Sequence, residues 1–211
     1  MPRKPAHEQF DTLQALRDHA FLLFARHGYE GVSIGDIAKA TGLSKGALYW
    51  HFDGKAELYL DCLKRLHRLF WRYIFEPMAA TPDPVAGVLQ LFRGLEQLVR
   101  DPEIEHGVGG YWLIPHTPET APMREAQRRF ELDSAAVITE VLRRGVQQQR
   151  FDLADDLEDM ARAMIALMET VILPLRDKPP EEVHRIMAVL ARTLFRAYAK
   201  DQDLVQLLRA F

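Results

Sequence analysis

The feature that most constrains this chain is residues 32–55, VSIGDIAKATGLSKGALYWHFDGK, in which two short helical patterns flank a glycine. Ser33 precedes the first pattern and Asp36 follows three residues later. This pair is an aspartate variant of the capping box, and it predicts where the first helix begins. Gly42 can adopt the positive φ that ends a helix and turns the chain sharply. The stretch therefore predicts two helices joined by a tight turn.

The second of these helices is predicted to begin after Ser44, whose hydroxyl can cap it. Leu48 and Phe52 are four residues apart, so they fall on one face and can be buried together. The other face carries basic and aromatic side chains: Lys45, Tyr49 and His51. A short helix with such a face, placed after a glycine turn, is typical of helix-turn-helix proteins. We therefore expect this face to bind DNA.

Charge is distributed unevenly along the chain, although the net charge of the 211 residues is only −3. The first 75 residues carry a basic excess and the remainder an acidic excess, which favours a nucleic-acid-facing amino-terminal part. The single cysteine, Cys62, cannot form an internal disulfide, and its place in an apolar helix face predicts burial. No run of about 18 apolar residues is present. We expect a cytoplasmic protein.

Helical periodicity dominates the rest of the chain, and no segment alternates like a β-strand, so the expected fold class is all-α. Helices are predicted over about residues 7–27, 55–75, 84–100, 122–148, 155–174 and 181–200. Pro77 is expected to stop the second of these. We expect a three-helix DNA-binding domain over 1–54, a connecting helix over 55–76, and a larger helical ligand-binding and dimerisation domain over 77–211.

Two segments of the larger domain stand out. In the 122–148 helix the residues expected to be buried are Phe130, Leu132, Val137, Ile138, Val141 and Leu142. Residues 101–123 instead contain several glycines and prolines, so at most a short helix is expected there. Such a break in a helical protein often permits movement or lines a cavity.

The amino-terminal part resembles the tetracycline-repressor (TetR-type) family of transcriptional regulators. The resemblance rests on an ordered set of residues: Gly28-Tyr29-Glu30-Gly31, Ser33, Ile37-Ala38, Gly42 to Gly46, Leu48 to Phe52, and Lys55. Two departures are minor. Val32 stands where the family often has threonine, and Gly54 where serine or aspartate often caps the next helix, although glycine is still an acceptable N-cap.

The resemblance implies a role in DNA binding for particular residues. Contacts with the DNA backbone are implied for Ser33, Tyr49, Trp50, His51 and Lys55. Base edges are implied to lie against Lys45, Gly46 and Ala47, with Ser44 at the start of the same helix. The chemistry agrees, because a lysine can reach O6 and N7 of guanine and a glycine lets the backbone approach closely.

The resemblance further implies a homodimer and a small-molecule effector. In the family, the last two long helices pair across a two-fold axis as a four-helix bundle, and an effector bound among the carboxy-terminal helices releases the DNA operator. We expect a hydrophobic effector, because ligand sites are mostly apolar and methionine adapts to varied shapes. The residues expected to line its pocket are Phe92, Tyr111, Trp112, His116, Met164 and Met168.

Catalytic and metal-binding motifs are not found in the sequence. The eight histidines show no HExxH spacing or Cys–His cluster, and no phosphate loop or GxSxG elbow occurs. We therefore expect no enzyme activity, no cofactor and no metal. Two hypotheses stay open: a ligand-responsive repressor, or a DNA-binding structural or adaptor protein of the same fold without an inducer. A cavity near Trp112 would favour the first, and a filled core the second.

Overall fold

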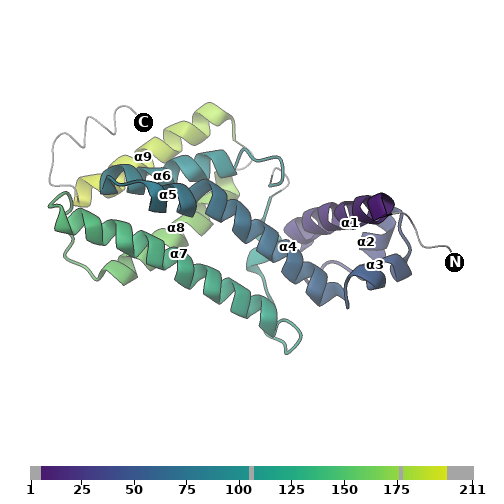
Figure 1. Ribbon diagram of the computed structural model, residues 1–211. Helices are drawn as coiled ribbons and strands as arrows, with labels where there is room; N and C mark the ends of the chain where they lie inside the picture. The colour runs from purple at the N-terminus through teal and green to yellow at the C-terminus, as the bar shows by residue number, and fades with distance from the viewer. Residues whose placement is uncertain (1–5, 105–106, 176–177, 199–211) are drawn as a thin grey trace. The chain divides into compact units, whose positions relative to one another are not determined.

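The computed structural model describes residues 6–104, 107–175 and 178–198, and every regular element in these ranges is helical (Figure 1). This confirms the predicted all-α fold. In chain order the elements are α1 (Ala6–His27), α2 (Ile34–Thr41), α3 (Lys45–His51), α4 (Lys55–Phe70), the π-helix η1 (Trp71–Phe75), α5 (Glu76–Ala80), α6 (Pro84–Leu98), the 3₁₀-helix η2 (Gly109–Trp112), α7 (Ala121–Gln147), α8 (Leu157–Leu175) and α9 (Pro180–Tyr198). None of the described helices is long and apolar enough to cross a membrane.

The chain forms two compact units. The first comprises residues 1–67 and 106–127, and the second comprises residues 68–105 and 128–211. The segment around η2 thus belongs to the same unit as the amino-terminal helices. These two units are defined by the contacts within each of them. The sequence analysis divided the chain by expected function, at residues 54 and 76, and that division stays a prediction.

Aromatic rings fill the core of the first unit. The Tyr59 ring is in edge contact with the rings of Phe24 and Tyr29, at centroid distances of 4.9 and 5.3 Å. Tyr111 packs against Phe21 at 5.4 Å and against Tyr59 at 5.3 Å. Such aromatic pairs contribute about 0.5–1.5 kcal/mol each beyond the burial of their area. This cluster joins α1 and α4 to η2.

The segment η2 lies so close to α1 that only a glycine fits at one position. A Cβ atom on Gly110 would lie 2.1 Å from the carbonyl oxygen of Phe24. Two tyrosine hydroxyls hold the segment in place: Tyr59 donates to the carbonyl oxygen of Gly110 at 3.3 Å, and Tyr111 donates to that of Phe21 at 3.0 Å. The fold of the first unit therefore depends on contacts between residues that are far apart in the sequence.

Two ion pairs fix α1 against α4. Arg17 binds both carboxylate oxygens of Asp61, at 2.9 and 3.2 Å, and Arg65 pairs with Asp18 at 2.6 Å. A two-pronged arginine–carboxylate contact defines orientation as well as distance. Cys62 lies beside them and is buried, as predicted, and this burial raises the pKa of its thiol.

The helical path of the second unit does not stop at Pro77, so that prediction is wrong. The backbone widens into the π-helix η1 and then continues as α5, in which Pro77 occupies the first turn. Proline is accommodated more readily in the first turn of a helical segment than in its interior, and here the widened turn of η1 directly precedes it. Gly94 of α6 packs directly on η1, since a Cβ atom there would lie 2.3 Å from the carbonyl oxygen of Tyr73.

Phe130 connects α7 to the rest of the second unit. Its ring makes edge contacts with Phe70 at 5.7 Å and with Phe75 at 5.9 Å. Further along α7, Val141 lies against α6 at Gly87, where an added Cβ atom would meet the valine side chain at 3.0 Å. The buried face of α7 thus follows a line of apolar contacts with α6 and η1.

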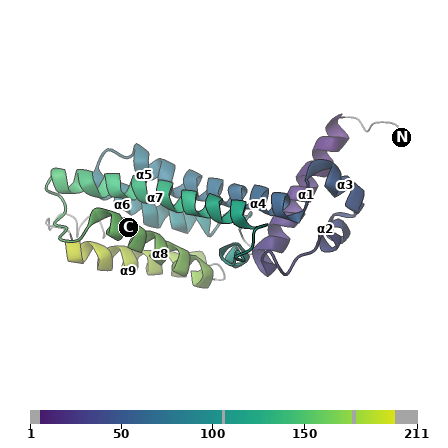
Figure 2. The ribbon, with the colours of Figure 1, turned by 90° about the horizontal axis from the view of Figure 1, so that it is seen from below.

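The helix α9 packs on α6. Glu96 of α6 lies 3.2 Å from His184 of α9 and also binds Arg100 at 2.7 Å. Arg100 in turn donates to the carbonyl oxygen of Pro180 at 3.2 Å, at the start of α9. Figure 2 shows α8 and α9 on the same side of this unit. The charged contacts therefore tie the start of α9 to α6.

Candidate nucleic-acid interface

Local hydrogen bonds define α2 and the turn that follows it. The Ser33 hydroxyl accepts from the backbone N–H of Asp36 at 3.1 Å, and the Asp36 carboxylate accepts from the backbone N–H of Ser33 at 2.9 Å. The hydrogen bonds from Ser33 hold the pKa of Asp36 below its usual value. Gly42 has φ 69°, and its conformation ends the helix. The predicted capping box and glycine turn are both confirmed.

The second helix of the pair, α3, is anchored by an apolar face. Ser44 caps it by accepting a hydrogen bond from the backbone N–H of Ala47 at 3.1 Å. Leu48 and Phe52 are both buried, as predicted. Because these two side chains hold one side of α3 against the unit, its other side faces outward.

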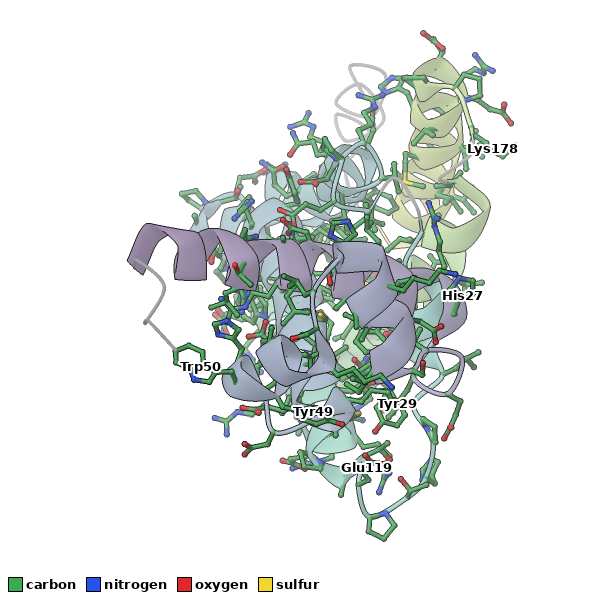
Figure 3. All side chains as sticks on the ribbon, turned by 90° about the vertical axis from the view of Figure 1, so that its right-hand side faces the viewer. His27, Tyr29, Tyr49, Trp50, Glu119 and Lys178 are labelled. Carbon is green, nitrogen blue, oxygen red and sulfur yellow. The ribbon has the colours of Figure 1, made fainter. Side chains whose placement is uncertain are left out.

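The outward side of α3 presents large aromatic rings to the surroundings. Tyr49 is 56% exposed and Trp50 is 65% exposed, and Figure 3 shows Trp50 projecting away from the helix. The Trp50 ring meets the ring of His51 edge-on at 5.0 Å. Exposed rings of this size are uncommon on a surface that contacts only water. Lys45 and Gly46 lie at the exposed start of the same helix.

The two predicted DNA-binding lysines have different surroundings. The Lys45 ammonium group reaches back toward the start of α2, where a Cβ atom on Gly35 would lie 3.8 Å from its Nζ. Lys55, at the start of α4, donates to the carbonyl oxygen of Tyr29 at 3.0 Å, and its Nζ lies 4.0 Å from the centroid of the Tyr29 ring. Such a cation–π contact contributes about 0.5–1 kcal/mol at an exposed site.

Tyr29 has a second charged neighbour that the sequence analysis did not identify. Burial and the nearby Glu119 carboxylate both raise the pKa of the Tyr29 hydroxyl, and Figure 3 labels both residues. Glu119 comes from the segment between η2 and α7, within the first unit. Tyr29 belongs to the motif that carries the family resemblance, but nothing in the sequence pattern points to Glu119.

The arrangement has the chemistry of a DNA-binding surface. Hydroxyls, lysines and helix N-termini can donate to phosphate oxygens, and these contacts set the position of a protein on the duplex. Side chains on the exposed face of a short helix can reach base edges in the major groove. Ser33, Ser44, Lys45, Gly46, Tyr49 and Trp50 are exposed, while Ala47, His51 and Lys55 are partly exposed.

The six residues predicted to line an effector pocket are divided between the units. The first unit contains Tyr111, Trp112 and His116, and the second contains Phe92, Met164 and Met168. Tyr111 fills the aromatic core of the first unit, and His116 is exposed. Phe92 and Met168 are buried within the second unit. A pocket formed by all six stays a prediction.

A capped helix, a glycine turn and a second helix with an exposed basic and aromatic face define a DNA-binding protein of the helix-turn-helix class. Residues 16–62 match the model of the bacterial regulatory proteins, tetR family. The HTH-type transcriptional regulator AcrR of Shigella flexneri is 31% identical over 153 residues, which are 70% of each chain. The chain belongs to the tetR family of transcriptional regulators.

Solved structures show the same fold. A TetR transcriptional regulator from Chloroflexus aurantiacus superposes with a TM-score of 0.72 at 21% identity, covering 88% of this chain and 95% of that one. A complex of SmeT with triclosan gives a TM-score of 0.68 at 20% identity, covering 91% and 93%. At this level of identity the likeness shows the fold alone, and it covers nearly the whole chain.

Proposed function

We propose that this regulator is a homodimeric repressor that binds double-stranded operator DNA through α3 and the start of α2, and that a small hydrophobic molecule releases it. The observation that carries the proposal is the pairing of a buried face on α3, Leu48 and Phe52, with an exposed face that carries Lys45, Tyr49 and Trp50. In this reading Lys45 contacts base edges, and Ser33 and Lys55 contact phosphates.

Dimerisation is proposed from the surfaces of α8 and α9. Each of these helices leaves small or apolar side chains exposed: Ala163, Ala166 and Val189. A helix as short as α3 reads only a few base pairs, so two copies related by a two-fold axis would provide the affinity that one copy lacks. Burying these exposed positions against a second copy would remove apolar area from water.

The proposal of a hydrophobic effector rests on the side chains inside the second unit and on one solved structure with the same fold. The interior of this unit is rich in aromatic and methionine side chains, among them Phe92 and Met168. SmeT, which shares this fold, has been solved with triclosan. Both observations support a hydrophobic effector, in preference to a DNA-binding adaptor without one.

Selection of bound duplexes from a random-sequence pool tests the DNA-binding proposal. The full-length protein should enrich two half-sites related by two-fold symmetry, about 34–36 Å apart or a multiple of this spacing. Lys45→Ala should change the preferred base at one or two positions, with a loss of discrimination of about 1–3 kcal/mol. An equal loss of affinity for every duplex would contradict base reading by Lys45.

A further inference from the structure

Six glycines lie between residues 28 and 54, in and around the helix-turn-helix region. Four of them have a reason within the fold, either a positive φ or a Cβ position already filled by backbone: Gly28, Gly31, Gly42 and Gly54. Gly35 and Gly46 have neither feature. The folded chain itself therefore does not require glycine at these two positions.

Gly35 lies in the first turn of α2 and is partly exposed. A Cβ atom there would meet the Ser33 hydroxyl oxygen at 3.4 Å, and Cε and Nζ of Lys45 at 3.7 and 3.8 Å. These are ordinary van der Waals distances, so an alanine would fit. Alanine would also favour the helix, because glycine loses more backbone entropy on folding. The glycine therefore makes the free protein less stable than an alanine would.

The empty side of Gly35 faces the surface assigned to DNA. The side chains nearest to its missing Cβ atom are those of Ser33 and Lys45. The first is assigned to a phosphate and the second to base edges, and both are exposed. A group of the duplex that enters between these two side chains would meet the bare backbone of α2.

The start of α3 repeats this arrangement. Each of the two helices begins with a serine cap, one further residue and then a glycine: Ser33-Ile34-Gly35 and Ser44-Lys45-Gly46. At Gly46 the nearest atom to an added Cβ would be the Ser44 hydroxyl oxygen, at 3.8 Å. Glycine is the usual residue where a backbone comes very close to a ligand. The repeat therefore indicates one close approach of DNA on each helix.

We propose that Gly35 is a DNA-contact residue, against which the sugar–phosphate backbone lies directly, between the Ser33 hydroxyl and the Lys45 side chain. A methyl group at this position would hold α2 away from the duplex. Contacts with sugar and phosphate fix the position of a protein on DNA but carry no sequence information directly. Gly35 thus determines how closely α2 docks on every sequence. This inference rests on the proposed operator binding and adds to it a residue without charge or side chain.

Gly35→Ala in the full-length protein tests the contact. Fluorescence anisotropy measures its affinity for the operator selected from the random pool and for the same operator with one altered base pair. The variant should bind both duplexes about tenfold more weakly than the wild type, because a methyl group forced into a close contact costs about that factor. The slope of log K against log salt should not change, because no charge is lost. Undiminished affinity would overturn the proposal, and so would a loss confined to one duplex.

Two further variants separate contact with DNA from other effects. Ala40→Leu adds a larger side chain at an exposed position about 140° around α2 from Gly35, and should bind the operator like the wild type. An equal loss there would overturn the proposal. Gly35→Ala is also combined with Lys45→Ala, and should cost the same factor in that background. Disappearance of the loss would mean that position 35 acts only by displacing Lys45, and would likewise overturn it.

Thermal unfolding without DNA shows whether the fold of the variant is intact. Gly35→Ala should unfold at a temperature no lower than the wild type, because alanine fits there and favours the helix. A fall of several degrees would give the glycine a role inside the fold and would overturn the proposal. If the wild type selects no duplex at all, the repressor function itself is wrong and the inference falls with it. Equal binding by the wild type and Gly35→Ala refutes the contact alone.

Discussion

The ammonium group of Lys55 is held by Tyr29 in two ways, through a 3.0 Å hydrogen bond to its carbonyl oxygen and through contact with its ring at 4.0 Å. An ammonium group has three N–H donors, so Lys55 can hold Tyr29 and a DNA phosphate together. The lysine side chain is thereby oriented before DNA arrives. Orientation of this kind reduces the entropy lost when the phosphate binds.

Replacing Lys55 with methionine should weaken binding evenly on matched and mismatched operators. The variant keeps much of the side-chain volume but loses one positive charge. The slope of log K against log salt should therefore become shallower by about 0.9, the contribution of one phosphate contact. Fluorescence anisotropy at several salt concentrations measures this slope. Lys64→Met, at an exposed position of α4, is the matched control and should leave the slope unchanged.

Gly110→Ala should destabilise the first unit by about 1–3 kcal/mol, because its Cβ atom would lie 2.1 Å from the backbone oxygen of Phe24. Denaturant unfolding measures the loss. Gly46→Ala is the control, since a Cβ atom there meets only the Ser44 hydroxyl, at 3.8 Å. It should fold at least as stably as the wild type while binding operator less well. If the two variants were equally stable, the backbone around Gly110 would have moved away from α1 at little cost in free energy, and the prediction would be wrong.

The capping box predicts a dependence of stability on acid pH. The pKa of Asp36 is lowered in the folded protein by its hydrogen bonds with Ser33, so the charged form stabilises the fold. This contribution is present above the usual aspartate pKa and is lost as the pH falls through the lower folded value. Asp36→Asn should unfold at a lower temperature at pH 7, and the difference from the wild type should shrink toward pH 3. A difference that stays constant over this range would contradict the assignment.

Disruption of the proposed dimer requires substitutions at exposed positions. Ala161 and Met168 are buried within the protomer, so charged residues there would disturb its own core. Val189 is 52% exposed on α9, and Val189→Glu together with Ala166→Glu should yield folded monomers. Sedimentation velocity measures the change. Leu132→Glu, at a position 49% exposed on α7, is the control and should leave the dimer intact.

The helix-turn-helix region could be predicted from sequence because its determinants are local. Ser33, Asp36 and Gly42 act within a few residues of one another, and the structure confirms their roles. Burial of Leu48 and Phe52 followed from their spacing. The side chain of Lys55 could not be placed in this way, because Tyr29 approaches it only after α1 and α4 have packed together.

Predictions for α7 were partly wrong because they relied on residue type. Leu132 was expected in the core but is 49% exposed, since it falls on the outer side of the helix. Ser134 lies at the centre of the buried side and was missed because it is polar. The spacing of Phe130 and Ile138 around it was the available signal. A periodic pattern locates a buried face better than the hydrophobicity of each member does.

Because η1 is a π-helix, the number of residues in this segment determines the orientation of the helix that follows, in addition to the identity of its residues. A π-turn holds about one residue more than an α-turn, so residues 71–75 contain the equivalent of a one-residue insertion. Deleting a single residue there would allow an ordinary α-helix, but each following side chain would turn by about 100° around the helix axis. Met78, now fully buried, would leave its place in the core. Single-residue deletions in this segment should therefore be far less tolerated than conservative substitutions.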